Sequence, residues 1–173
     1  AKLFELDNEA IQWVERTISD MTLEEKIGQL FICLGKRSDE AYIRQMVNKY
    51  HIGGARFTET AAEKIYAQNC CYQQNSKIPL LIAVYCETGG NGICKEGTFV
   101  ATEAECGASG DAETAYWMGK ISGREAEAVG CNWNFAPIAD IVTNWRNTIV
   151  NSRSFGKAPD IVLKMCKEYI RGV

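Results

Sequence analysis

Two acidic residues and one arginine follow apolar segments of this chain. Glu87 comes after the run "LIAVYC", Asp140 closes "NFAPIAD", and Arg153 lies in "NSRSFG". A pair of carboxyl groups at strand ends can act as general acid and as nucleophile or base in sugar hydrolysis. The guanidinium of an arginine can bind two sugar hydroxyls or a carboxylate as a fork. The alternative for all three residues is structural, with carboxylates that hold loops and an arginine in a salt bridge.

Other kinds of chemistry fit the sequence poorly. The glycines of "ETGGNGI" lack both the Lys-Ser/Thr of a P-loop and the spacing of a dinucleotide-binding motif. They therefore indicate a turning loop rather than a phosphate cradle. His51 is the single histidine and precedes a predicted strand, so we expect it at the opposite end of the sheet from Glu87 and Asp140. A Ser-His-Asp or Cys-His arrangement cannot be built there.

The elements that must position these residues alternate regularly. Apolar runs predict strands, and apolar residues at helical spacing predict helices. Thr22 with Glu25 predicts a capping box, and Thr60 with Glu63 predicts a helix cap. We expect long loops at 86–110 and 136–159. The predicted strands are 30–34, 52–57, 79–85 and 131–135, and the predicted helices are 9–19, 38–50, 60–75, 111–129 and one from about 160.

Strict strand–helix alternation predicts a parallel sheet covered by helices. A small-residue stripe, Ala115, Gly119 and Gly123, predicts a helix that approaches the sheet closely. Two architectures fit, an open doubly wound sheet and part of an eight-stranded barrel. A complete barrel usually needs about 250 residues, whereas these 173 residues supply four strands. In both architectures the chemistry lies at the carboxyl ends of the strands, where Glu87 and Asp140 fall.

Composition narrows the function classes. The net charge is −3 and the basic residues are dispersed, so we expect no nucleic-acid partner. The longest apolar runs are far shorter than the about 18 residues of a membrane helix, so we expect no membrane partner. The eight cysteines form no C-x-x-C pair, and with one histidine they predict no metal site and no cofactor. Reduced structural thiols favour a reducing compartment, so we expect a cytoplasmic protein.

Five segments carry a resemblance to a known family. The segments "MTLEEKIGQLF", "IGGARF", "IPLLIAVYCETGGNGI", "SGREAEAVGCNWNFAPIADI" and "NSRSFG" resemble the N-terminal barrel domain of family 3 glycoside hydrolases, in the family's order. The resemblance runs from about Met21 to Val173. It implies a (β/α)8 TIM-barrel type of fold, of which residues 1–173 hold the first half, about four βα units with a leading helix. It also implies a carbohydrate substrate and retaining hydrolysis of β-linked sugars, as in β-N-acetylhexosaminidases and β-glucosidases.

The resemblance assigns substrate-binding roles residue by residue. Arg153 matches the family's sugar-binding arginine, Asp140 matches the acid closing the "APIAD"-like motif, and Glu87 matches the glutamate of the "EGG"-like turn. Two positions depart from the pattern. Tyr85 stands where the family often has a sugar-binding aspartate, and Thr88 stands where it usually has glycine. We expect Tyr85 to stack on the sugar or to fill the subsite, which puts ordinary specificity in question.

The family's nucleophile and acid/base follow later strands, so the resemblance implies no catalytic residue within this chain. Our leading hypothesis is a fragment that is inactive alone. Half a barrel leaves open edge strands and an exposed apolar interior, which predicts self-association. The alternative is a non-catalytic half-barrel that binds sugar or a protein partner. A third hypothesis is an unrelated open-sheet enzyme that uses Glu87 and Asp140 directly.

Overall fold

The sheet has four parallel strands in sequential order. The computed structural model describes residues 6–35, 39–56 and 60–173. The strand order is β1-β2-β3-β4, with neighbours parallel throughout. Sequential order is that of a barrel segment, because a doubly wound sheet reverses its order at a switch point. The predicted half-barrel is therefore confirmed. The strands are β1 Ile32–Leu34, β2 Gly54–Arg56, β3 Leu81–Val84 and β4 Trp133–Asn134.

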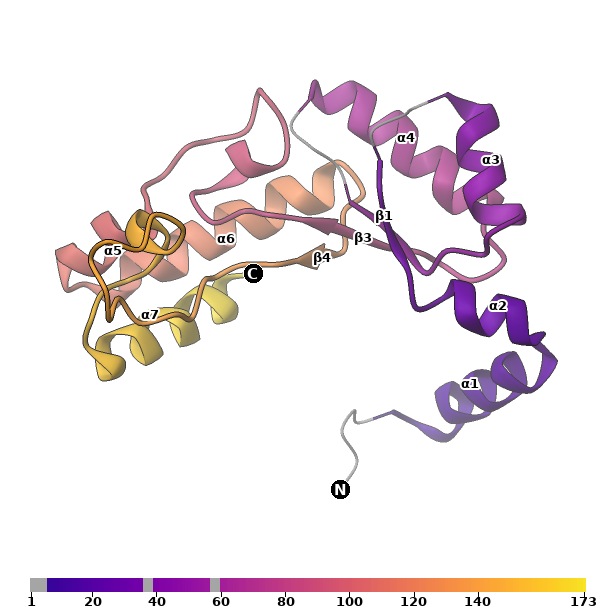
Figure 1. Ribbon diagram of the computed structural model, residues 1–173, viewed down its shortest axis with the longest axis horizontal. Helices are drawn as coiled ribbons and strands as arrows, with labels where there is room; N and C mark the ends of the chain where they lie inside the picture. The colour runs from indigo at the N-terminus through magenta and orange to yellow at the C-terminus, as the bar shows by residue number, and fades with distance from the viewer. Residues whose placement is uncertain (1–5, 36–38, 57–59) are drawn as a thin grey trace.

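The helices group at the two ends of the sheet. Figure 1 shows α3 and α4 together at one end, α5, α6 and α7 at the other, and α1 apart from both groups. The first helix buries none of its residues. The bounds are α1 Asn8–Asp20, α2 Leu23–Gly28, α3 Glu40–Asn48, α4 Ala62–Asn75, α5 Glu103–Ser109, α6 Ala112–Ala128 and α7 Pro159–Gly172, with short 3-10 turns η1 Gly90–Gly92 and η2 Asn151–Arg153.

Two apolar clusters hold the helices in place. The first joins α3, α4 and the end of α6 to the outer side of the strands through residues such as Ile65, Ile82 and Ala126. The second joins α5, α6 and α7 through Met118 and Met165. The second cluster includes Cys106 and Phe155 from the segments that follow β3 and β4, so it anchors the segments in which the candidate site residues occur.

Some predicted helix starts are confirmed and others are wrong. The capping box of Thr22 and Glu25 is present. The start predicted at Ser38 lies outside the described residues, and Asp39 caps α3. The predicted cap at Thr60 and Glu63 is wrong, because Ala61 precedes α4 without a side-chain cap bond. The carboxylate of Glu96, from the loop after β3, instead accepts a hydrogen bond from Ala62 N at 2.9 Å.

The segment after β3 is not the long loop that we predicted. It contains η1 and the helix α5, which starts with a second capping box formed by Thr102 and Glu105. The small-residue stripe of α6 also has another role than predicted. A side chain at Gly119 would overlap the Tyr169 carbonyl oxygen, and one at Gly123 would crowd Val173. The stripe therefore lets α7, and not the sheet, approach α6.

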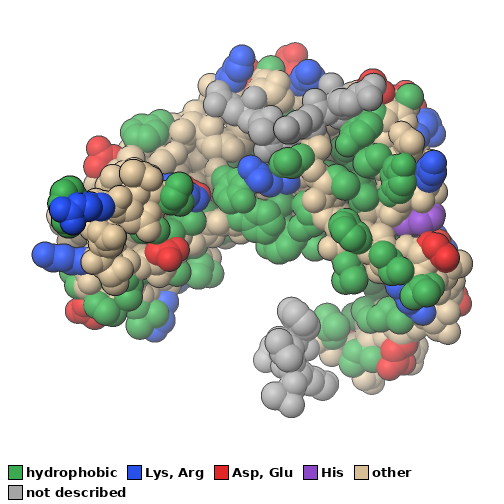
Figure 2. All heavy atoms as spheres, in the orientation of Figure 1, with side chains coloured by type: hydrophobic (Ala, Val, Ile, Leu, Met, Phe, Trp, Pro, Cys, Tyr) green, Lys and Arg blue, Asp and Glu red, His purple; other side chains and the backbone are tan. Residues whose placement is uncertain are grey.

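The inner face of the sheet, opposite the helices, is open. Because side chains alternate along a strand, Ile32, Leu34, Leu81 and Trp133 share this face, and each is 38–47% exposed. Figure 2 shows apolar side chains gathered on the hollowed side of the molecule. Trp133 is therefore an exposed side chain on this face and not a core residue. The exposed apolar interior predicted for half a barrel is present. Within the described residues no helix is long and apolar enough to cross a membrane.

Candidate functional site at the carboxyl ends of the strands

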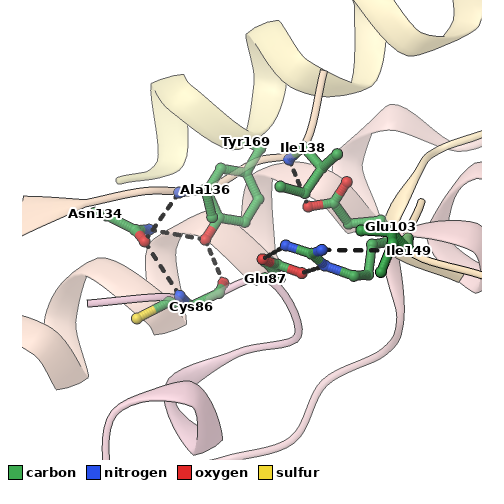
Figure 3. A network of polar contacts seen from close by, with 9 residues as sticks. Cys86, Glu87, Glu103, Asn134, Ala136, Ile138, Ile149 and Tyr169 are labelled. Carbon is green, nitrogen blue, oxygen red and sulfur yellow. Dashed lines mark hydrogen bonds and ion pairs between the residues drawn. The ribbon is translucent and has the colours of Figure 1, made fainter. Parts of the chain in front are cut away.

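Glu87 and Arg153 form a two-point ion pair where the chain leaves β3. Arg153 Nε donates to Glu87 Oε2 at 2.7 Å, and Nη2 donates to Oε1 at 2.7 Å. Figure 3 shows the Glu87 carboxylate with both bonds of this pair as dashed lines. The Glu87 side chain is 14% exposed and that of Arg153 is 41% exposed. Hydrogen bonding to Glu87 raises the pKa of Arg153. Two of the four residues predicted to bind substrate are thus in direct contact.

A hydrogen-bond network holds the ends of β3 and β4 to α7. Asn134 Oδ1 accepts from Cys86 N at 3.1 Å and from Ala136 N at 3.2 Å. Asn134 Nδ2 donates to the Tyr169 hydroxyl at 3.0 Å, and that hydroxyl donates to the Cys86 carbonyl at 2.5 Å. Figure 3 shows this network beside the ion pair. Since Cys86 precedes Glu87, the network fixes the backbone from which the Glu87 carboxylate extends.

Glu103 is a buried carboxyl group next to the ion pair. It is fully buried, and its Oε1 accepts from Ile138 N at 2.9 Å, while Oε2 is buried without a partner. Burial is the main cause that raises the pKa of Glu103 to about 8, and the nearby Glu87 carboxylate also raises it. The hydrogen bond from Ile138 N and the charge of Arg153 act in the opposite direction and lower this pKa. Glu103 is therefore protonated at neutral pH, as is usual for a carboxyl group held away from water. It ties α5 to the segment after β4.

Tyr85 lies on the inner face, between aromatic and cationic neighbours. Its ring centroid is 5.4 Å from that of Phe135, whose own centroid is 4.6 Å from that of Trp133. The Arg56 guanidinium lies 4.2 Å from the centroid of the Tyr85 ring. These side chains form an aromatic surface with a cation on it, beside the ion pair.

Asp140 lies in the same loop region but has a different environment. It is exposed, and its carboxylate makes no hydrogen bond or ion pair within the part of the chain that the structure describes. Its main-chain carbonyl accepts from Ser154 Oγ at 2.6 Å. This bond connects the end of the "APIAD" segment to the residue after Arg153. The structure therefore joins Asp140 to the site through its backbone and not through its carboxylate.

The cysteines are apolar packing residues in this structure. All eight are free, and Cys86 and Cys131 belong to the first apolar cluster. Burial raises the pKa of the Cys86 thiol to about 12 and that of Cys131 to about 11. Among residues 6–35, 39–56 and 60–173, no group of three or more His, Cys, Asp or Glu side chains is placed to hold a metal ion.

Sequence reasoning missed three residues of this region, Glu103, Asn134 and Tyr169. The capping-box pattern Thr102–Glu105 was a usable signal for α5 and would have placed Glu103 in its first turn. Asn134 follows Trp133 in the two-residue strand β4. No local sequence pattern indicates that its side chain hydrogen-bonds to the neighbouring strand. Arg56 was also overlooked, although a charged residue within an otherwise small and apolar strand is unusual.

Comparisons with known proteins agree with the fold and the motifs. Residues 22–173 match the glycosyl hydrolase family 3 N terminal domain. A beta-N-acetylglucosaminidase/beta-glucosidase of Cellulomonas fimi is 34% identical over 98% of this chain and 30% of its own length. The solved structure of a beta-glucoside phosphorylase, BglX, bound to 2FGlc, is 35% identical with a TM-score of 0.91, over 99% of this chain and 31% of that one.

A third relative comes from Paenibacillus sp. str. FPU-7. Its family 3 beta-N-acetylglucosaminidase structure is 32% identical with a TM-score of 0.77, over 88% of this chain and 31% of that one. The chain thus spans about a third of the length of these relatives. The region that matches the family, residues 22–173, contains every helix and strand described above except α1. The chain therefore belongs to glycosyl hydrolase family 3, over that family's N-terminal domain.

Proposed function

We propose that this chain is the substrate-binding half of a barrel domain, spanning residues 1–173, from a retaining glycoside hydrolase that acts on β-linked sugars. The sugar is a β-N-acetylhexosaminide or a β-glucoside, by analogy with the relatives named above. Arg153, Glu87, Tyr85 and Asp140 belong to its substrate site. The observation that carries the proposal is the two-point Glu87–Arg153 ion pair at the carboxyl ends of the strands.

The ion pair supports a binding role for Glu87 in preference to a catalytic one. Both carboxylate oxygens accept charge-assisted bonds from Arg153, which makes Glu87 a poor nucleophile. Arg153 is held at the strand ends with part of its surface open to solvent. A guanidinium oriented in this way can still donate to sugar hydroxyls. We therefore propose that the nucleophile and the acid/base lie outside this chain, and that the chain alone is inactive.

Assays with chromogenic β-glycosides test this proposal. We expect the 173-residue chain to release no nitrophenol from the β-glucoside or the β-N-acetylglucosaminide, with or without inorganic phosphate. Phosphate is included because one relative is a phosphorylase. A longer protein of the same reading frame should be active, and Arg153→Gln should raise its KM. Hydrolysis by the short chain that is lost in Glu87→Gln would overturn the proposal and support direct catalysis by Glu87.

A second candidate function is a half-barrel that binds sugar or a protein partner without catalysis. The Tyr85 ring in place of a carboxylate, with Arg56 against it, favours this alternative. Binding of a methyl β-glycoside by the chain, together with inactivity of the longest protein in the reading frame, would select this function. Glycosidase activity of the longer protein would exclude it.

We also propose that the isolated chain self-associates through the inner face of its sheet. Leu34, Leu81 and Trp133 expose apolar surface there, and β1 and β4 are the edge strands of the described sheet. Light scattering should give a mass above that of one chain, and Leu81→Lys should lower it. A single-chain mass for the unaltered protein would contradict this. We further propose a cytoplasmic location, which its free cysteines support.

A further inference from the structure

Arg56 is a cation on the inner face of the sheet. It is the last residue of β2, and the strand register places it opposite Ala83 and on the same face as Trp133. Its guanidinium lies over the Tyr85 ring, with 4.2 Å between its central carbon and the ring centroid. The aromatic contact fixes the position of the charge but does not neutralise it.

Among the described residues, no acidic group forms an ion pair with Arg56. Its Nε is buried and has no hydrogen-bond partner within the described ranges. The neighbouring cation, Arg153, differs in this respect because Glu87 neutralises it. A buried donor without a partner costs stability, so this group calls for a partner that the described residues do not supply.

Two further features suit a charged sugar. The Tyr85 hydroxyl makes no hydrogen bond within the described part of the chain and can donate beside the guanidinium. The rings of Tyr85, Phe135 and Trp133 offer a surface on which the apolar side of a sugar can rest. A sugar placed there would present one end to the Glu87–Arg153 pair and another to Arg56.

We propose that Arg56 and Tyr85 form a subsite for an anionic substituent, so that the preferred substrate is a β-glycoside whose sugar carries a carboxylate or a phosphate. This proposal rests on the proposed function, in which Tyr85 and Arg153 line the sugar site. A uronic acid would supply the carboxylate, and a sugar 6-phosphate would supply the phosphate. Arg56 determines specificity and takes no part in bond cleavage.

Binding to the 173-residue chain, at a concentration at which light scattering gives a single-chain mass and the inner face is free, tests the subsite without any need for turnover. The ligands are methyl β-D-glucoside, methyl β-D-glucuronide and methyl β-D-glucoside 6-phosphate, titrated by NMR or calorimetry. We expect one of the two charged glycosides to bind about tenfold more tightly than the neutral one, a gain within the range of one charge-assisted contact. Arg56→Gln should remove this preference, so that the charged and neutral glycosides bind with equal affinity.

A matched control separates a specific contact from a general charge effect. Arg44→Gln removes the same charge from α3, where Arg44 pairs with Glu40 away from the inner face. It should leave the preference intact. Loss of the preference in Arg44→Gln, or its persistence in Arg56→Gln, would overturn the proposal.

The remaining outcomes distinguish the subsite from the function on which it rests. Equal binding of neutral and charged glycosides, weakened in Arg153→Gln, would overturn the anionic subsite and keep the sugar site. Binding that is unchanged in Arg153→Gln would count against the sugar site itself. Absence of binding for all three glycosides would overturn both for this chain. Tighter binding of the glucuronide identifies a uronic acid, and tighter binding of the phosphate ester identifies a sugar phosphate.

Discussion

Replacing Glu103 with glutamine should remove a strong pH dependence from the stability of this chain. Burial raises the pKa of Glu103 from an ordinary 4.5 to about 8. In the unfolded chain the carboxyl loses its proton near its ordinary pKa, while the folded chain keeps the proton. The raised pKa therefore contributes stability that is fully present below about pH 4.5 and is lost as the pH rises through about 8.

The magnitude follows from the size of the shift. Each pKa unit corresponds to 1.36 kcal/mol, so a shift from 4.5 to about 8 lowers the free energy of unfolding by about 5 kcal/mol across that range. This loss is comparable with the whole stability of many domains. Glutamine has nearly the shape of the protonated carboxyl and keeps the acceptor for Ile138 N. The variant should match the parent near pH 5 and exceed its stability increasingly toward pH 8.

Urea unfolding followed by circular dichroism at half-unit pH steps between 5 and 8.5 measures this difference. The matched control is Glu105→Gln, two residues along the same helix. Glu105 is exposed, and its bond from Thr102 N lowers its pKa. The stability that ionised Glu105 contributes is therefore lost toward acid pH. Above pH 5, the free energy of unfolding of Glu105→Gln should fall with rising pH as it does in the parent. Parallel curves for the parent and Glu103→Gln would show that Glu103 is ionised in the folded chain and would refute the reasoning.

Three other perturbations have defined outcomes. Arg153→Gln should lower the free energy of unfolding by about 1–2 kcal/mol, because it leaves the mostly buried Glu87 carboxylate unpaired at a partly solvated site. Arg153→Lys should recover only part of this loss, because a lysine cannot bond both carboxylate oxygens as the guanidinium does. Gly119→Ala should destabilise the chain by about 2 kcal/mol or more in the same assay, because the added methyl group meets the Tyr169 carbonyl and forces α7 away from α6. The Cys86 thiol, with a pKa of about 12, should resist iodoacetamide at pH 8 in the folded chain and react in denaturant, as mass spectrometry of peptides can show.

Each of these has an internal control. Arg171→Gln breaks an exposed ion pair with Glu168 and should change the unfolding free energy little; an equal loss in both arginine variants would contradict the special role of Arg153. Glu127→Ala, on the exposed side of α6, should be nearly neutral, and an equally neutral Gly119→Ala would show that the helices do not pack as described. Cys70, which is only half-buried, should be alkylated before Cys86; the reverse order would contradict the burial of Cys86.

Local patterns in the sequence predicted the alternating parallel strands and helices, and the family resemblance then favoured the half-barrel over the open doubly wound sheet. Apolar residues recur every 2 positions in a strand and every 3.6 positions in a helix, so their spacing indicates which face of the element contacts a core. A window of about ten residues is enough to see this spacing. The capping box at Thr22 was readable for the same reason, because its two residues are three positions apart. The motifs around Glu87 and Arg153 also marked both residues, although not their contact.

Only the tertiary structure decided which residues meet. Glu87 and Arg153 are 66 residues apart in the chain, and Asn134 and Tyr169 are 35 apart. Such contacts depend on how the helices pack on the sheet. The same holds for α4, whose first N–H is capped by Glu96 from a distant loop, and for the stripe of α6, which faces α7. The protonated state of Glu103 was likewise unreadable from sequence, because it depends on burial that several separate segments create together.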